Sequence, residues 1–225
     1  MDSMLGQATY QLGPLEVTGS VVTSYLVSGV LVGLAYLVRP GAEPVGGREA
    51  AVEGLVASLD SAIEGIVGER HREVLPFVGT LWIVLVVANL VGLIPGLHSP
   101  TRDLSVTAAL AVLSFLSVHW FGIRAVGMRK YLSHYLHPNP ILLPFHLISE
   151  VSRTLALAVR LFGNVMSLEM TALLILMVAG FLAPIPILML HIIEALVQAY
   201  IFGVLTLVYI AGGVQTQKEN LEETN

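Results

Sequence analysis

The sequence of 225 residues contains no cysteine and few charged side chains. Without cysteine, disulfide bonds, thiolate metal sites and thiol chemistry are excluded as the basis of its function. Charged residues make up only 12% of the chain and hydrophobic residues 55%, whereas about a quarter of the residues in a soluble globular domain are charged. This balance predicts an integral membrane protein.

Signals for several other functions are missing as well. The formal net charge is −5 and the eleven Lys and Arg residues are scattered, so there is no basic cluster to bind nucleic acid. There is no Gly-rich phosphate loop, G-x-S-x-G elbow or nucleotide signature, so any ATP would be bound by another subunit. His191 and Glu194 resemble half of a carboxylate-bridged metal motif, but its second half is missing. We therefore expect no cofactor, no metal ion and a non-catalytic chain.

Apolar runs predict the membrane helices. Residues 17–38, 76–97 and 105–128 each supply the roughly twenty apolar residues that cross a bilayer core of about 30 Å. Residues 1–16 precede the first crossing and are predicted to be an external segment. Two longer runs, 141–180 and 187–212, come before a polar tail at 213–225. The predicted fold is an all-α integral membrane protein with about five membrane helices and one amphipathic surface helix.

The length of the fourth run has a consequence for its geometry. No proline interrupts the chain from Phe145 to Ala183. A helix of about forty residues is roughly 60 Å long, twice the thickness of the bilayer core. The last two helices are therefore expected to be long and steeply tilted.

Residues 49–68 form the predicted amphipathic helix. Acidic residues recur at helical spacing on one face and apolar residues on the other; the acidic set is Glu49, Glu53, Asp60 and Glu64. Anionic headgroups would repel this face. Two interpretations remain open: a surface helix that packs on protein, or an ordinary solvated face.

Basic residues predict the orientation, because they are enriched on the cytoplasmic side of membrane proteins. One set of span ends carries Arg39, Arg48, Arg70, Arg72, Arg124, Arg129 and Lys130. The other side shows Arg102 alone. We expect a multi-pass protein of a bacterial plasma membrane, since no transit peptide is seen, with the N-terminus outside and the C-terminus cytoplasmic.

Polar residues recur inside the last two predicted helices. Steps of three or four residues connect a polar stripe on the fourth span, interrupted by one leucine: His146, Glu150, Arg153, Leu157, Arg160 and Asn164. The final helix carries His191, Glu194 and Gln198 at the same spacing. The other histidines that we considered, His119, His134 and His137, are interpreted as interfacial residues.

Arg160 needs an explanation, because burying a charge at bilayer depth costs at least about 2.5–3.5 kcal/mol. One interpretation is a structural ion pair with Glu150, Glu169 or Glu194. The other is an ion pathway, since carboxylates and histidines exchange protons and a guanidinium does not. One fixed charge among titratable groups would act as a gate.

Several stretches resemble a known family. The segments SRTLALAVRLFGN, VQAYIF and GVLTLVYI, with NLVGLIP and TRDLSVTAALA upstream, are similar to the a subunit of the membrane sector of F-type ATP synthases. The similarity covers about residues 75–212.

The resemblance implies roles for individual residues. Arg160 would be the family's essential arginine, which faces the rotating ring of c subunits. Glu169 and His191 would belong to the half-channel open to the outside, with Asn164 and Gln198 near the arginine. The last two helices would lie tilted against the ring, and the acidic helix would lie on the cytoplasmic surface. The implied partners are the c-subunit ring, b-type peripheral stalk subunits, the rest of the synthase and the lipid bilayer.

Two positions depart from the family pattern and affect the cytoplasmic half-channel. Thr154 stands where a proline commonly follows the basic residue Arg153, and His146 occupies a site that is often acidic. Glu194 is a candidate addition to the ion path.

The resulting hypothesis is an ion-translocating stator subunit. Protons or sodium ions would enter along Glu169, His191 and Glu194, ride on a ring carboxylate, and leave past the cytoplasmic polar group of His146, Glu150 and Arg153. Arg160 would separate the two routes and favour the ionised form of the arriving carboxylate. The alternatives are a self-contained polytopic ion or solute transporter and a structural assembly subunit, although no internal repeat typical of transporters is visible.

Overall fold

A computed structural model describes residues 9–12, 15–37, 47–94, 99–128, 131, 143–180, 183 and 185–222. His134 and His137 lie outside the described residues. The described part contains six long helices: α1 (Gly19–Leu37), α2 (Gly47–Val67), α3 (His71–Val91), α4 (Leu104–Val126), α6 (Leu143–Ala179) and α7 (Ile185–Glu222). Two 3₁₀ turns, η2 (Gly68–Arg70) and η3 (Pro100–Arg102), precede α3 and α4.

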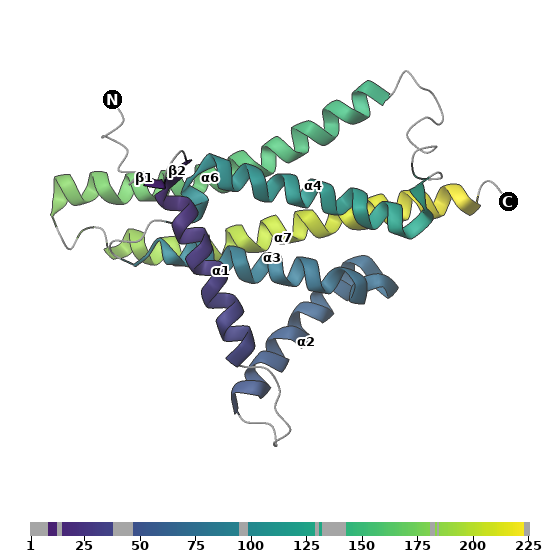
Figure 1. Ribbon diagram of the computed structural model, residues 1–225, viewed down its shortest axis with the longest axis horizontal. Helices are drawn as coiled ribbons and strands as arrows, with labels where there is room; N and C mark the ends of the chain where they lie inside the picture. Colours follow the sequence, from purple (N-terminus) through teal and green to yellow (C-terminus); the bar gives the residue numbers. More distant parts are fainter. Residues whose placement is uncertain are drawn as a thin grey trace.

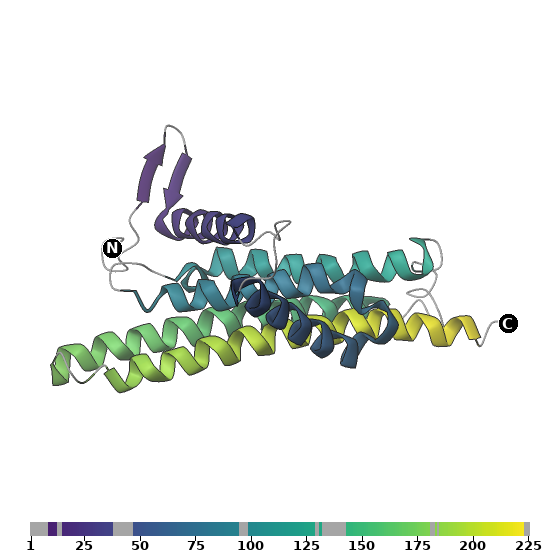
Figure 2. The same cartoon turned by 90° about the horizontal axis from the view of Figure 1, so that it is seen from below.

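Five of these helices are long and apolar enough to cross a membrane: α1, α3, α4, α6 and α7. The prediction of an all-α membrane protein with about five membrane helices is confirmed. The structure adds a small antiparallel hairpin, β1 (Thr9–Leu12) and β2 (Leu15–Thr18), within and just beyond the predicted external segment. In Figure 2 this hairpin projects from the helical body beside the start of α1.

The last two helices run antiparallel and are the longest. Figure 1 shows α7 running back alongside the C-terminal half of α6, while the first turns of α6 diverge from α7. They contain 37 and 38 residues, about 55 Å each at 1.5 Å per residue. The structure continues α7 to Glu222, beyond the predicted helix end at 212.

The helix α7 is central to the packing, since it contacts α2, α3, α4 and α6. The main core cluster joins α3, α4, α6 and α7 through Leu81, Leu85, Ala111, Leu157, Ala158, Leu161, Ala199 and Phe202. A second cluster fixes the end of α2 on α3, α4 and α7 through Ile63, Val74, Val78, Trp82, Val118, Leu207 and Ile210. The two clusters hold α6 and α7 on a platform made by α3 and α4.

A close approach of α3 and α7 occurs at Gly203. A side chain there would overlap the indole of Trp82, whose Nε1 donates a hydrogen bond to the carbonyl oxygen of Tyr200 at 3.3 Å. The rings of Trp82 and Tyr200 are also stacked, with centroids 6.1 Å apart. The absence of a Cβ at residue 203 therefore sets the distance between the two helices.

The start and end of α4 follow from local chemistry. Asp103 caps the helix by accepting a hydrogen bond from the backbone N–H of Ser105, which satisfies one of the free donors of the first turn. Gly127 follows the last residue with a φ of +86°, a conformation that glycine adopts readily.

The amphipathic helix α2 combines both interpretations of its acidic face. Ile63 is buried against α3 and α7, while the side chains of Glu53 and Glu64 are exposed. Asp60 lies 3.6 Å from His71 at the start of α3. The C-terminal half of α2 therefore packs on protein and directs most of its acidic face outward.

Candidate functional site

Arg160 lies near the middle of α6 and is directed away from the core. Its neighbours Leu157 and Leu161 are buried in the main cluster, whereas Arg160 itself is exposed and Val159 beside it is 57% exposed. No ion pair or hydrogen bond joins Arg160 to any other described residue. The guanidinium is therefore available to a partner outside this chain.

Two of the three carboxylates considered as ion-pair partners of Arg160 pair with other arginines. Glu150 pairs with Arg153, Nη1 to Oε1 at 3.3 Å. Glu169 pairs with Arg102, Nη1 to Oε2 at 3.1 Å. The nearest carboxylates of α6 thus have counter-charges of their own.

A hydrogen bond joins α6 to α7 one turn beyond Arg160. The Nδ2 of Asn164 donates to Oε1 of Gln198 at 2.7 Å. Gln198 is 2% exposed, and its Nε2 has no hydrogen-bond partner in the described structure. Such a bond is favoured in a low-dielectric interior, where an unpaired amide is costly.

Next to this bond a small open cleft lies between α6 and α7. Its lining residues are Asn164, Val165, Leu168, His191, Glu194, Ala195 and Gln198. The structure therefore brings together four residues predicted for the ion path, Asn164 from the first turn beyond Arg160 and His191, Glu194 and Gln198 from α7. His191 is 4% exposed, so its ring faces the interior of the helix pair.

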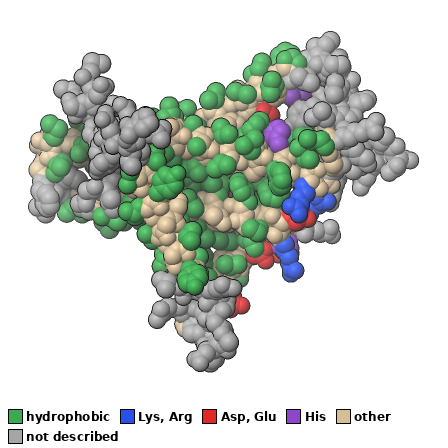
Figure 3. Space-filling model, in the orientation of Figure 1, with side chains coloured by type: hydrophobic (Ala, Val, Ile, Leu, Met, Phe, Trp, Pro, Cys, Tyr) green, Lys and Arg blue, Asp and Glu red, His purple; other side chains and the backbone are tan. Residues whose placement is uncertain are grey.

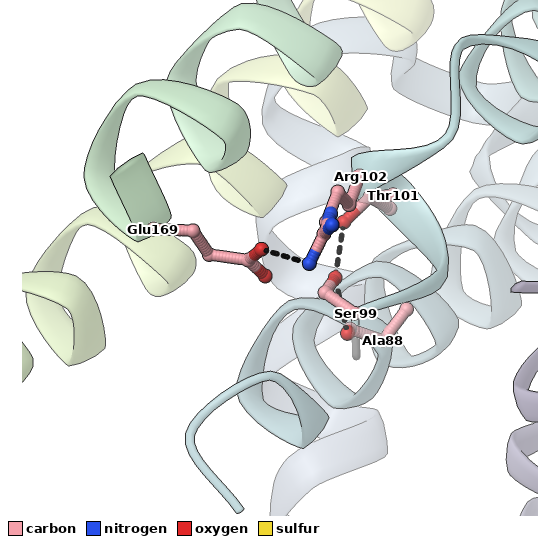
Figure 4. Close-up of polar contacts among 5 residues, drawn as sticks. All are labelled: Ala88, Ser99, Thr101, Arg102 and Glu169. Carbon is pink, nitrogen blue, oxygen red and sulfur yellow. Dashed lines mark hydrogen bonds and ion pairs between the residues drawn. The ribbon is translucent and has the colours of Figure 1, made fainter. Parts of the chain in front are cut away.

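The ion pair of Glu169 with Arg102 was not predicted (Figure 4). Arg102 ends η3, 67 residues before Glu169, and both side chains are largely buried, at 14% and 16% exposure. The sequence contained one signal: Arg102 is the lone basic residue on the outer side of the predicted topology. Because the structure buries this charge, it needs a partner, and Glu169 is the acidic residue on the facing helix.

A chain of hydrogen bonds holds η3 beneath this ion pair (Figure 4). Ser99 donates to the carbonyl oxygen of Ala88 and contacts the hydroxyl of Thr101. Thr101 donates to Oδ1 of Asn89 at 2.8 Å, and Nδ2 of Asn89 donates to the carbonyl oxygen of Ala195 at 3.3 Å. The network therefore connects η3 and α3 to a residue that lines the cleft.

Another group of polar residues lies toward the start of α6, on the other side of Arg160. Besides its pair with Glu150, the guanidinium of Arg153 lies 4.2 Å from the ring centroid of Tyr209 on α7, a favourable cation–π geometry. Thr154 donates to the carbonyl oxygen of Glu150 at 2.9 Å within the helix. His146 is exposed one turn before Glu150, and the structure does not place it with the cleft residues.

The site thus consists of two polar groups separated along α6 by Arg160. Glu150 lies ten residues before Arg160 and Glu169 nine residues after it, so each carboxylate is about 14–15 Å from the level of Arg160 along the axis. This arrangement belongs to polytopic helical membrane proteins that move ions, since buried ionisable groups in membrane helices mark such paths.

The chain belongs to the ATP synthase A chain family, whose model matches residues 20–211. It is 53% identical over 224 residues to "ATP synthase subunit a" of Legionella pneumophila, covering 96% of this chain and 95% of the relative. It is 60% identical over 211 residues to "ATP synthase subunit a 1" of Hahella chejuensis, covering 93% and 89%. With "ATP synthase subunit a 2" of Pelobacter propionicus the identity is 59% over 212 residues, covering 93% and 92%.

These findings confirm the family predicted from the sequence and the function of an a subunit in the membrane sector of ATP synthase. A self-contained transporter is not favoured. The apolar helices and the bacterial relatives place the chain in a bacterial plasma membrane, as part of the synthase complex.

Proposed function

We propose that the chain forms two ion half-channels against a ring of c subunits and couples ion flow through them to rotation of the ring. The observation that carries this proposal is the exposed guanidinium of Arg160 in the middle of α6, between two groups of buried or paired polar residues. If each of the two polar paths is closed at its inner end and a fixed charge lies between them, ions can cross only on a moving carrier.

The outer half-channel contains the cleft between α6 and α7. Ions enter past Glu169 and reach His191 and Glu194, which line the cleft together. The bond from Asn164 to Gln198 closes its inner end close to Arg160. This end of the path delivers an ion to a ring carboxylate that approaches Arg160.

The cytoplasmic half-channel follows the start of α6. Ions leave the ring and pass His146, Glu150 and Arg153. The pairing of Arg153 with both Glu150 and the ring of Tyr209 orients this group between α6 and α7. Glu150 lies nearly three helical turns before Arg160, about 15 Å along the axis, which separates this group from the outer path.

Arg160 performs the gating step. As a loaded ring carboxylate approaches, the guanidinium favours the ionised form of that carboxylate, so the ion is released on the exit side. Because a guanidinium stays charged at all physiological pH values, it also repels cations that would pass directly between the half-channels. Ion flow is thereby tied to rotation.

The outer surface of the molecule suits contact with the ring and lipid. Exposed apolar side chains extend along both long helices, including Leu155, Val159, Leu174, Leu196, Val197, Tyr200 and Val208, and Figure 3 shows apolar side chains over much of one face. The Lys and Arg side chains visible on that face gather toward one end, near the junction of α2 and α3. In our proposal this end is the cytoplasmic one, in keeping with the positive-inside rule, with the N-terminus outside and the C-terminus inside. The b-type stalk subunits and the rest of the complex would complete the stator.

Reconstitution of the whole complex tests the proposal. Vesicles that contain it should synthesise ATP when an ion gradient is imposed, and varying sodium with and without a protonophore identifies the ion. The Arg160→Gln variant should assemble normally and lose synthesis entirely. Synthesis by this variant at the wild-type rate would rule out the proposed gate.

A further inference from the structure

Arg102 is a charged residue to which the proposed path assigns no function. Its guanidinium carries a permanent positive charge, its side chain is 14% exposed, and Nη1 lies 3.1 Å from Oε2 of Glu169. The contact joins η3 to α6 across 67 residues of sequence. Neither local helix geometry nor chain connectivity requires it.

The backbone that carries Arg102 is held firmly. Ser99 and Thr101 are fully buried and bonded to α3, and Asn89 continues the network to α7. On the other side, Asp103 is engaged in capping α4, where Oδ1 accepts from both the N–H and the hydroxyl of Ser105. Arg102 therefore projects from a fixed base toward Glu169 instead of pairing with the adjacent acid.

The carboxylate of Glu169 is confined at the same place. At Gly92, which ends α3, a Cβ would meet Ser99 at 3.0 Å and Oε1 of Glu169 at 3.5 Å. Glu169 lies one turn after Val165 and next to Leu168, both of which line the cleft. The carboxylate is thus held between η3 and the end of α3 at the outer end of the cleft.

We propose that Arg102 is a positioning residue of the outer half-channel, which fixes the Glu169 carboxylate at the entrance and supplies its counter-charge. The inference rests on the proposed function of Glu169 as an entrance group. Arg102 acts through Glu169 and does not carry ions itself. Without Arg102 the carboxylate would lose its fixed orientation and would add an unpaired negative charge beside the cleft that holds His191 and Glu194.

ATP-driven ion pumping by the whole complex in vesicles tests this proposal. We expect Arg102→Gln to reduce pumping at least about tenfold and Arg102→Lys, which keeps the charge, to restore most of it. If the two side chains act as one unit, their effects are not additive. The double variant Arg102→Gln/Glu169→Gln should then be no slower than the slower of the two single variants. The matched control is Arg124→Gln, at an exposed arginine of α4, which should pump at the wild-type rate.

Assembly is measured in parallel as the amount of intact complex in the membrane. If Arg102→Gln does not assemble, the importance of the ion pair is tested with the charge exchange Arg102→Glu/Glu169→Arg. We expect the exchange variant to assemble better than Arg102→Glu alone or Glu169→Arg alone, because the exchange restores the ion pair. Three results would overturn the proposal. They are wild-type pumping by Arg102→Gln, additive losses of pumping in the double variant, and an exchange variant that assembles no better than Arg102→Glu or Glu169→Arg alone. Failure of the proposed function would appear separately, as Arg160→Gln with intact ion-driven synthesis.

Discussion

The charged residues of α6 differ in one physical respect, which is whether this chain provides their partner. Glu150 and Glu169 are paired with Arg153 and Arg102, while Arg160 has no partner among the described residues. An unpaired charge at bilayer depth costs at least about 2.5–3.5 kcal/mol. A counter-charge on a neighbouring subunit would recover that free energy, which is the physical reason to place a ring carboxylate opposite Arg160.

Asn89 offers a test of the network beneath the entrance. It is fully buried, accepts a hydrogen bond from Thr101 and donates one to the carbonyl oxygen of Ala195. Asn89→Leu keeps a side chain branched at Cγ but removes both hydrogen bonds, so we expect a loss of about 0.5–1.5 kcal/mol for each. The measurement is the thermal unfolding midpoint of the purified complex, which should fall.

The control for this prediction is Thr80→Val. It also removes a polar side-chain group from α3, but this group is an exposed hydroxyl that bonds within its own helix to the carbonyl oxygen of Pro76. Its effect should stay within about 0.5 kcal/mol. Equal midpoints for the two variants would contradict the structural importance of the Asn89 network.

At the scale of elements, the two longest helices depend on the platform formed by α3 and α4. Each of the long helices exceeds the bilayer thickness of about 30 Å, and each exposes apolar side chains along much of its length. Their relative position is therefore set by the buried side, where α7 packs on α3 and α4. Changes at these contacts should affect coupling even though Arg160 itself takes no part in them.

The contact of Gly203 with Trp82 makes this expectation testable. In Gly203→Ala the new methyl group would overlap the indole, and the overpacking should cost about 1–3 kcal/mol as α3 and α7 move apart. We expect less assembled complex and slower ATP synthesis per assembled complex. Trp82→Leu in the same chain should relieve part of the assembly defect.

A second glycine serves as the matched control. Gly33→Ala in α1 introduces a Cβ with no atom within 4 Å and favours the helix by up to about 1 kcal/mol. It should leave assembly and synthesis unchanged. If Gly203→Ala behaved like Gly33→Ala, the close approach of α3 and α7 would not be important for coupling.

Local patterns predicted the helical elements and failed for contacts between distant residues. Hydropathy indicated the five apolar helices because their length and composition are properties of contiguous sequence. Helical spacing likewise placed His191, Glu194 and Gln198 on one stripe, and all three of these residues line the cleft. The pairing of Arg102 with Glu169 depends on how η3 packs against α6. Periodicity in the sequence cannot indicate a contact between such distant segments. The hairpin at Thr9–Thr18 was missed because its strands are only four residues each.

At the scale of the whole molecule, the distribution of charge supports both the proposed orientation and the proposed ion path. The basic residues Arg70, Arg72 and Arg124 lie at the end predicted to be cytoplasmic, and Arg102 at the other end is neutralised by Glu169. Between these ends, α6 and α7 expose mainly apolar side chains, with Arg160 as a charged exception. Moving one charge through 100 mV supplies about 2.3 kcal/mol, so a leak past Arg160 would waste the driving force for ATP synthesis.

The most direct test of this account is ATP-driven ion pumping by the Arg160→Lys complex in vesicles. Lysine keeps a positive charge but lacks the delocalised planar guanidinium, and it loses its proton more readily when buried. The account predicts assembled complexes that hydrolyse ATP and pump few or no ions. Ion pumping at the wild-type rate by this variant would contradict the central claim that the guanidinium of Arg160 separates the two half-channels.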